Sequence, residues 1–345
     1  MNPDPQNMKQ SIYEFPDHMT RAMEIGRKIR LKKDYSFIRN VVVTGMGGSA
    51  IGGDVTRALM NDKLKYPLMV NRRYDLPSWV NESTLVICSS YSGNTEETLA
   101  AFQDAVDRGA AVLGITTGGR LQEKLLEHGF EFVLIPPGLQ PRAALAFSFI
   151  PMLYLGVQAG FLNGGDPTEI LSGARSLLES VRDQYRKEQL ENPTYKLAQA
   201  IYRTLPVIYG ESETTGIVAV RWKGQLAENG KMLSYSNELP ELNHNEIVGW
   251  ENNPRLLKSI SLIWLLDKNS HPRIITRHRI SEKIINSRVA DQYTIEVSGS
   301  NAFSRLLHLI HYGDWVSYWC AMAHGTDPTP VHKIDQLKKE LSRRK

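Results

Sequence analysis

Two stretches near the N-terminus constrain the fold of this chain more than any other part of its sequence. They are VVVTGMGGSA at residues 41–50 and ICSSYSGNTEET at residues 87–98. In each, an apolar run typical of a buried strand stops abruptly in small and hydroxyl residues, and a helical segment follows. A helix N-terminus offers free N–H groups and partial positive charge, so two such strand ends side by side suit a small anion.

Hydroxyl side chains are concentrated in these two loops. Ser49 follows the first strand, and Ser90, Ser92 and Thr95 follow the second. Together with the backbone N–H groups at Gly48 they can hold a phosphate with little help from Lys or Arg. Helix capping by Thr95 alone is the simpler interpretation, but it leaves Ser90 and Ser92 unexplained. The pattern therefore predicts a site for a phosphorylated small molecule.

The glycines of the first loop also suggest a dinucleotide turn, which the sequence disfavours. The G-x-G-x-x-G pattern that starts at Gly45 needs a glycine at position 50, where this chain has Ala50. The acidic residue expected about 20 residues further on is poorly placed, since Asp75 comes 30 residues after Gly45. A tight strand-to-helix turn explains these glycines without a nicotinamide cofactor, and no cofactor is expected.

Strands and helices are expected to alternate along the chain, which predicts parallel sheets flanked by helices in an α/β fold. The pattern starts at residue 39, breaks at Gly164-Gly165, and restarts at residue 205. Four regions are expected: an N-terminal helical segment (1–38), a first α/β domain (39–160), a helical connector (161–204) and a second α/β domain with C-terminal helices (205–345). The expected strands are 41–45, 68–71, 84–89, 111–116, 132–135, 206–209, 262–266 and 293–297.

Composition narrows the functional class. The 345 residues include 41 Lys and Arg against 37 Asp and Glu, a net charge of +4 that is too balanced to argue for nucleic acid. The segment 1–10 is polar and unlike a secretory signal, and no apolar run reaches the roughly 18 residues of a membrane span. We expect a cytoplasmic protein that contacts neither nucleic acid nor membrane.

A metal site is not expected. Cys88 and Cys320 are the only cysteines, so a metal would need other ligands. His308 and His311 are spaced to share one helix face, but no carboxylate at helical spacing accompanies them. A packed, aromatic-rich helix over 306–324 is the favoured interpretation.

A family resemblance extends this picture. The motifs GMGGS (45–49) and SYSGNTEET (90–98) resemble the sugar isomerase (SIS) fold. Three further motifs, PRAA (141–144), QLAENGK (225–231) and ELPELNHN (238–245), resemble the bifunctional phosphoglucose/phosphomannose isomerase family over essentially the whole chain. The resemblance implies two SIS-type αβα sandwich domains.

The chemistry of that family requires a base. An aldose phosphate becomes its ketose when a proton moves between C1 and C2 through a cis-enediol. Glu228 stands at the end of an expected helix over 215–229. Sequence pattern alone favours a solvent-exposed glutamate there, whereas the resemblance places the proton-transfer base at this position.

The resemblance also implies roles for three other side chains. His244 would open the sugar ring, reaching in from a neighbouring subunit, so that a homodimer would be needed. Arg142, where the family motif matches, would neutralise the developing enediolate or contact a hydroxyl of the sugar. Lys338 would be the catalytic lysine, with Lys333 as second choice. An exposed helix lysine is the alternative for either. A relative has threonine seven residues before Lys338, where this chain has Val331. A hydroxyl at that position would help the site accept both sugar epimers, so Val331 argues against equal use of the two.

The sequence thus predicts a metal-independent isomerase that interconverts glucose 6-phosphate, and mannose 6-phosphate, with fructose 6-phosphate. Gly48, Ser49, Ser90, Ser92 and Thr95 would bind the phosphate. The main alternative is a non-catalytic sugar-phosphate-binding SIS regulator, which would lack the Glu228, His244 and Lys338 set. An amino-sugar isomerase or deaminase of the same fold is a third hypothesis, and no ammonia-handling motif supports it.

Overall fold

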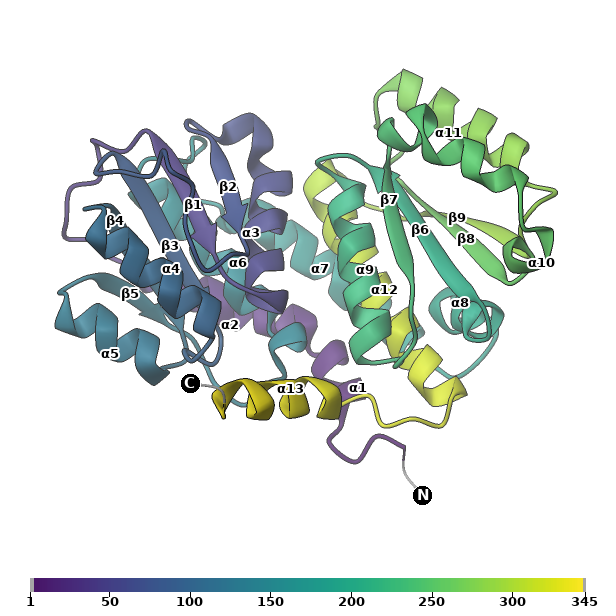
Figure 1. Ribbon diagram of the computed structural model, residues 1–345, viewed down its shortest axis with the longest axis horizontal. Helices are drawn as coiled ribbons and strands as arrows, with labels where there is room; N and C mark the ends of the chain where they lie inside the picture. Colours follow the sequence, from purple (N-terminus) through teal and green to yellow (C-terminus); the bar gives the residue numbers. More distant parts are fainter. Residues whose placement is uncertain (1–2, 344–345) are drawn as a thin grey trace. The chain divides into compact units, whose positions relative to one another are not determined.

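The computed structural model describes residues 3–343 and divides the chain into two compact units, each built on its own parallel sheet (Figure 1). The N-terminal unit comprises Glu14–Ser180 and Val297–His308. The C-terminal unit comprises the described residues up to Tyr13, Val181–Glu296 and those from Leu309 on. The expected α/β class is confirmed, while the boundaries at residues 39, 161 and 205 stay a prediction.

The sheet of the N-terminal unit has the strand order β2-β1-β3-β4-β5, and each neighbouring pair is parallel. Its sequence order reverses between β1 and β3, the arrangement of a doubly wound sheet. All five strands fall where the sequence predicts them, within two residues. They are β1 (Asn40–Thr44), β2 (Leu68–Asn71), β3 (Thr84–Ser90), β4 (Ala111–Thr116) and β5 (Glu131–Leu134).

Helices cover both faces of this sheet (Figure 1). Side chains alternate between the faces of a strand, and Val42, Val86 and Val112 form one core with the helices of one face. These helices are α4 (Glu96–Asp107) and α5 (Gly119–Glu127). On the other face, α3 (Gly47–Met60) packs against α6 (Leu145–Gln158), which packs against α2 (Phe15–Lys28). Two 3-10 turns, η1 (Asn61–Lys63) and η2 (Pro141–Ala143), follow α3 and precede α6.

The C-terminal unit has a parallel sheet with the order β7-β6-β8-β9. The strands are β6 (Leu205–Glu211), β7 (Tyr235–Leu239), β8 (Ile260–Leu266) and β9 (Asp291–Glu296). The helices wholly inside this unit are α1 (Met8–Tyr13), α8 (Pro193–Ile201), α9 (Thr215–Glu228), α10 (Pro254–Leu257), α11 (Pro272–Ile285) and α13 (His332–Ser342), with the 3-10 turns η3 (Glu241–His244) and η4 (Glu246–Glu251). Two helices, α7 (Thr168–Tyr185) and α12 (Ala302–Ala323), belong in part to each unit.

Strand β7 and helix α11 have no counterpart among the expected elements. The strand reads YSNEL and lies at the edge of the sheet, where Tyr235 is exposed, so it lacks the apolar run of a buried strand. The helix exposes two of its apolar residues, Ile280 and Ile284, which weakens its amphipathic pattern. Both elements are fixed by their neighbours in space rather than by local composition.

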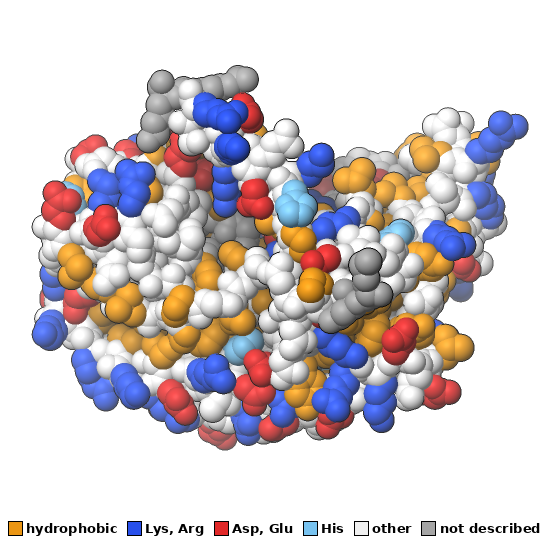
Figure 2. Space-filling model, turned by 90° about the horizontal axis from the view of Figure 1, so that it is seen from below, with side chains coloured by type: hydrophobic (Ala, Val, Ile, Leu, Met, Phe, Trp, Pro, Cys, Tyr) orange, Lys and Arg blue, Asp and Glu red, His pale blue; other side chains and the backbone are white. Residues whose placement is uncertain are grey.

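The surface charge is mixed on one face of the molecule, and the helices are those of a chain without a membrane-spanning segment among the described residues. On the face seen in Figure 2, basic and acidic side chains are interspersed, with hydrophobic side chains between them. Within residues 3–343, no helix is long and apolar enough to cross a membrane.

One buried histidine links stability to pH. His18 on α2 is 2% exposed, and its ring lies 5.6 Å from the ring of Phe147. Desolvation lowers the pKa of His18 below 6.5, although the nearby Glu14 carboxylate acts in the opposite direction. The unfolded chain therefore binds a proton that the folded chain excludes.

We expect the free energy of unfolding to fall as pH decreases from about 7 to about 5, and to fall less in His18→Leu, which removes this proton uptake. Urea unfolding at several pH values measures both slopes. Parallel slopes for the two proteins would show that His18 titrates alike in the folded and unfolded chain.

Candidate active site

The two hydroxyl-rich loops meet at the point where the strand order of the N-terminal sheet reverses. Strands β1 and β3 are paired in register, with Thr44 opposite Cys88. The loops that follow them therefore leave the same edge of the sheet side by side. The backbone N–H of Tyr91 donates to Ser49 Oγ at 3.2 Å, so the two loops lie side by side, as the sequence predicts.

In the loop after β3, hydroxyls bond to one another and the following helix keeps its start uncapped. Ser90 Oγ and Thr95 Oγ1 are 2.9 Å apart, and Ser92 Oγ accepts from the backbone N–H of Asn94 at 3.2 Å. Thr95 is the N-cap residue of α4, but its side chain makes no capping hydrogen bond. The capping interpretation is wrong for the Thr95 hydroxyl, and among the described residues no side chain accepts from the first N–H groups of α4.

The glycines of the first loop allow a close approach of backbones. A Cβ at Gly45 would lie 2.8 Å from the carbonyl oxygen of Ser89, and one at Gly48 would lie 2.5 Å from that of Pro141. The start of α3 therefore rests on η2, which carries Arg142. The Arg142 side chain is buried, at 3% exposure. Close packing explains these glycines, as the tight-turn interpretation expected.

A third loop, after β4, braces the second one. Leu121 donates its N–H to the carbonyl oxygen of Gly93 at 2.9 Å, and Arg120 donates its N–H to Asn94 Oδ1 at 3.2 Å. Gly93 has a φ of +68° and leaves no room for a Cβ against the carbonyl oxygen of Gly118. The loop predicted to bind phosphate, residues 90–95 and called the phosphate loop below, is therefore held from both sides.

Tyr91, which sequence reasoning did not single out, joins four segments. Its N–H bonds Ser49, and its carbonyl oxygen accepts from the N–H and the hydroxyl of Thr117 at 3.2 and 2.7 Å. Its hydroxyl donates to the carbonyl oxygen of Pro136 at 2.9 Å and accepts from the N–H of Leu139 at 3.0 Å. Burial raises the pKa of Tyr91, so the hydroxyl keeps its proton. The sequence carries no local signal for these non-local bonds.

In the C-terminal unit, Glu228 is the last residue of α9 and is half-buried. Buried polar side chains on either side of it tie α9 to α12. Gln225 Nε2 donates to Asp314 Oδ1 at 2.7 Å, and Asn229 Nδ2 donates to Ser317 Oγ at 2.9 Å. One turn earlier, Arg221 forms an ion pair with Asp314, with its Nη2 at 2.8 Å from Oδ2. These contacts fix the backbone that carries Glu228.

His244 ends η3 and is exposed, between two side chains that are firmly held. Asn243 Nδ2 donates to Ser281 Oγ on α11 at 2.8 Å. The Glu246 carboxylate accepts from three side chains of the sheet, those of Tyr209, Tyr235 and Asn237. The loop around His244 is therefore rigidly presented, and its imidazole faces solvent.

The topology of the C-terminal unit keeps Glu228 and His244 apart. Helix α9 follows β6 and returns to the edge where β7 begins, so Glu228 lies at the amino edge of the sheet. His244 follows the carboxyl end of β7 and lies at the opposite edge. A helix of 14 residues is about 21 Å long, so the two side chains of one chain do not meet.

Lys338 and Lys333 are exposed on α13, which buries no residue. Within residues 3–343, neither ammonium makes a hydrogen bond or ion pair, and Val331 is the N-cap residue of the helix. The choice between the two lysines stays open.

Helix α12 carries His308 and His311, whose spacing would allow both to face one metal ion. His311 Nε2 accepts from Trp315 Nε1 at 3.2 Å, and His308 Nδ1 is 2.9 Å from the carbonyl oxygen of Ser298. Within the described part of the chain, no group of three or more His, Cys, Asp or Glu side chains could hold a metal ion.

The chain is similar to known proteins over nearly its whole length, so the similarity includes all these motifs. A bifunctional phosphoglucose/phosphomannose isomerase from Caldicellulosiruptor bescii is 44% identical to this chain over 97% of its length and 99% of the relative. One from Aquifex aeolicus is 36% identical over 91% of this chain and 93% of the relative. The chain belongs to the bifunctional phosphoglucose/phosphomannose isomerase family.

The fold comparisons agree with this family. Residues 190–341 match the family model described as the bacterial phospho-glucose isomerase C-terminal SIS domain. Among solved structures, the C-terminal domain of glucosamine-fructose-6-phosphate aminotransferase from Francisella tularensis has a TM-score of 0.71 at 14% identity. That match covers 94% of this chain and 98% of the other. The SIS fold expected from the sequence is confirmed.

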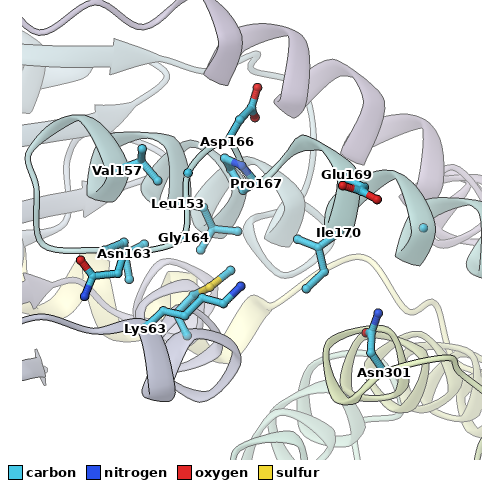
Figure 3. A pocket seen from close by; sticks show the side chains of 14 residues that line it. Lys63, Leu153, Val157, Asn163, Gly164, Asp166, Pro167, Glu169, Ile170 and Asn301 are labelled. Carbon is cyan, nitrogen blue, oxygen red and sulfur yellow. The ribbon is translucent and has the colours of Figure 1, made fainter.

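A separate cavity in the N-terminal unit contains none of the predicted site residues of this isomerase family member. It has a volume of about 430 Å³ and lies where α3 and α6 end, beside the start of α7. Figure 3 shows Lys63 along one wall, with the carboxylate of Asp166 directed away from it. The cavity is at the end of α3 remote from Ser49, so the phosphate loops are not part of it.

The contact of Gly48 with η2 gives a test of the phosphate loops. Gly48→Ala should weaken binding of inorganic phosphate by about tenfold or more, because the added methyl group must push α3 and η2 apart. Isothermal titration calorimetry measures the dissociation constant.

The matched control is Gly173→Ala on α7, where a Cβ meets open space. This variant should bind phosphate like the wild type and gain about 0.5–1 kcal/mol in stability. Equal phosphate binding by Gly48→Ala and the control would contradict the assignment of this loop.

Proposed function

We propose that this chain is an aldose–ketose isomerase that interconverts glucose 6-phosphate and mannose 6-phosphate with fructose 6-phosphate through a cis-enediol. The observation that carries the proposal is its similarity, over nearly the whole length, to relatives named for both isomerase activities. The hydroxyl-lined loops at the switch point of the N-terminal sheet support it, since they suit a phosphate group. A cytoplasmic location, predicted from the sequence, stays part of the proposal.

The phosphate end of the substrate is assigned to Gly48, Ser49, Ser90, Ser92 and Thr95. The side chains are neutral, so binding would depend on hydroxyl donors and on the uncapped start of α4. Ser90 and Thr95 already bond to each other, which orients both hydroxyls before a ligand arrives. Little reorganisation is then needed on binding.

Proton transfer is assigned to Glu228. Glucose 6-phosphate and mannose 6-phosphate yield the same enediol once C2 loses its proton, so one base serves both epimers. The bonds of Gln225 and Asn229 to α12 hold the end of α9 in place, as a positioned base requires. The buried guanidinium of Arg142 would stabilise the enediolate, a charge role that needs no metal ion.

Ring opening is assigned to His244 of a second subunit, with Lys338 assisting and Lys333 as the alternative lysine. His244 and Glu228 lie at opposite edges of one sheet, so a homodimer would have to bring them together. Exposed apolar side chains near His244, Val248 on η4 and Ile280 on α11, would suit a subunit contact. The segment around His244 is held in place by the hydrogen bonds of Asn243 to Ser281 on α11 and of Glu246 to Tyr235 on β7.

The first test is isomerisation of fructose 6-phosphate in EDTA, with glucose 6-phosphate and mannose 6-phosphate resolved. Glu228→Gln should lower kcat by about 10²–10⁴-fold, because the amide cannot accept the C1 or C2 proton. Glu24→Gln, an exposed glutamate on α2, is the control and should keep wild-type activity.

Three other outcomes of this assay would each contradict a part of the proposal. Binding of fructose 6-phosphate without conversion by the wild type would favour the non-catalytic SIS regulator. Activity that disappears in EDTA would contradict metal independence. Glucose 6-phosphate as the sole product would limit the enzyme to one epimer and direct attention to Val331.

The shared site has its own test. Glu228→Gln and His244→Ala, each inactive alone, should regain about a quarter of wild-type activity when mixed and allowed to exchange subunits. Half the dimers are then mixed, and each mixed dimer has one site with both Glu228 and His244 intact. If His244 acted on the substrate of its own subunit, mixing would restore nothing.

A further inference from the structure

The turn that leads to Arg142 is attached to the phosphate loop by one side chain. This turn is the segment 136–139, between β5 and η2. Within residues 3–343, its hydrogen bonds both involve the hydroxyl of Tyr91, which donates to Pro136 and accepts from Leu139. Pro136 and Pro137 have no backbone N–H, so the turn has few donors of its own, and Gly138 adopts a φ of +101°.

The phosphate loop, in contrast, does not depend on this hydroxyl. The backbone of Tyr91 bonds Ser49 and Thr117, and Gly93 accepts from Leu121. Removing the hydroxyl therefore leaves these bonds in place. Loss of the Tyr91 hydroxyl should therefore loosen the 136–139 turn and leave the phosphate loop in place.

Movement of the turn would pass directly to Arg142. Gln140 accepts from the N–H of Ala143 at 2.8 Å, so η2 begins as soon as the turn ends. Gly48 also packs closely against Pro141, so a displaced η2 would change its contact with the start of α3. A buried guanidinium cannot adjust freely to such a shift.

We propose that Tyr91 is a positioning residue, whose hydroxyl fixes the 136–139 turn and through it sets Arg142 relative to the phosphate loop. The proposal rests on the proposed function, in which Arg142 stabilises the enediolate. Tyr91 itself touches neither the phosphate nor the reacting carbons in this role. It couples the loop that binds the substrate to the segment that stabilises the transition state.

Tyr91→Phe tests this with the ring retained. We expect kcat for fructose 6-phosphate to fall about tenfold, as for a small displacement of a catalytic group. The inhibition constant of inorganic phosphate should stay within about twofold, because the backbone bonds of the phosphate loop persist. Unchanged kcat, or a kcat that falls only as much as the phosphate affinity, would overturn the proposal.

The matched control is Tyr154→Phe. Its hydroxyl also forms a hydrogen bond in the same unit, partly buried, with Thr168 Oγ1 at 2.7 Å, but Tyr154 is on α6, away from the turn. This variant should keep both constants. A similar loss of kcat in the control would mean that any lost hydroxyl has this effect, and would overturn the specific role of Tyr91.

A double-mutant cycle identifies the route. If Tyr91 acts through Arg142, adding Tyr91→Phe to Arg142→Ala should cost less than about twofold in kcat. A further tenfold loss would overturn the proposal.

Failure of the proposed function is distinguishable from failure of this inference. A wild-type protein that isomerises neither sugar phosphate contradicts the function, whatever Tyr91 does. Hydrogen exchange at the Leu139 amide then still tests the attachment, since it should be faster in Tyr91→Phe. Equal exchange in both proteins would overturn it.

Discussion

The parallel pairing of β1 with β3 is the constraint on which the candidate site depends. The two strands are central in their sheet, and the chain leaves them toward opposite faces, to α3 and to α4. Only at such a reversal do two strand-to-helix loops lie together with no helix crossing between them. This geometry brings the hydroxyls of Ser49, Ser90 and Thr95 close together. It also brings the backbones near Gly45 and Gly48 into close contact.

The C-terminal sheet has the same kind of reversal, between β6 and β8, but fills it differently. The Glu211 carboxylate at the end of β6 accepts from Ser270 Oγ at 2.6 Å. A phosphate at that corner would meet a like charge, and the hydroxyl that could donate to it is already used. The hydroxyl arrangement that suits a phosphate in the N-terminal unit is therefore not repeated at this corner of the C-terminal sheet.

Helix α9 shows how that unit holds Glu228, the residue proposed as the base. The ion pair of Arg221 with Asp314 is buried, and such pairs contribute little net stability, because desolvation offsets most of their attraction. Their value is geometric, since a buried, fully bonded network has few alternative arrangements. With Gln225 and Asn229 it fixes the end of α9, and Glu228 is carried there on a rigid helix.

The sequence by itself determined the alternation of strands and helices, the hydroxyl loops and the family motifs around Glu228 and His244. These signals are local, because apolar periodicity and turn residues act within a few positions of the chain. It did not determine β7, whose polar residues pair only because β6 lies beside them, or the bonds of Tyr91 to segments more than 40 residues away. Local pattern gave no sign that Glu228 and His244 lie apart in space, although they are only 16 positions apart in the sequence. Strand order placed them at opposite edges of one sheet, and strand order is decided by pairing across the whole unit, which no local pattern encodes.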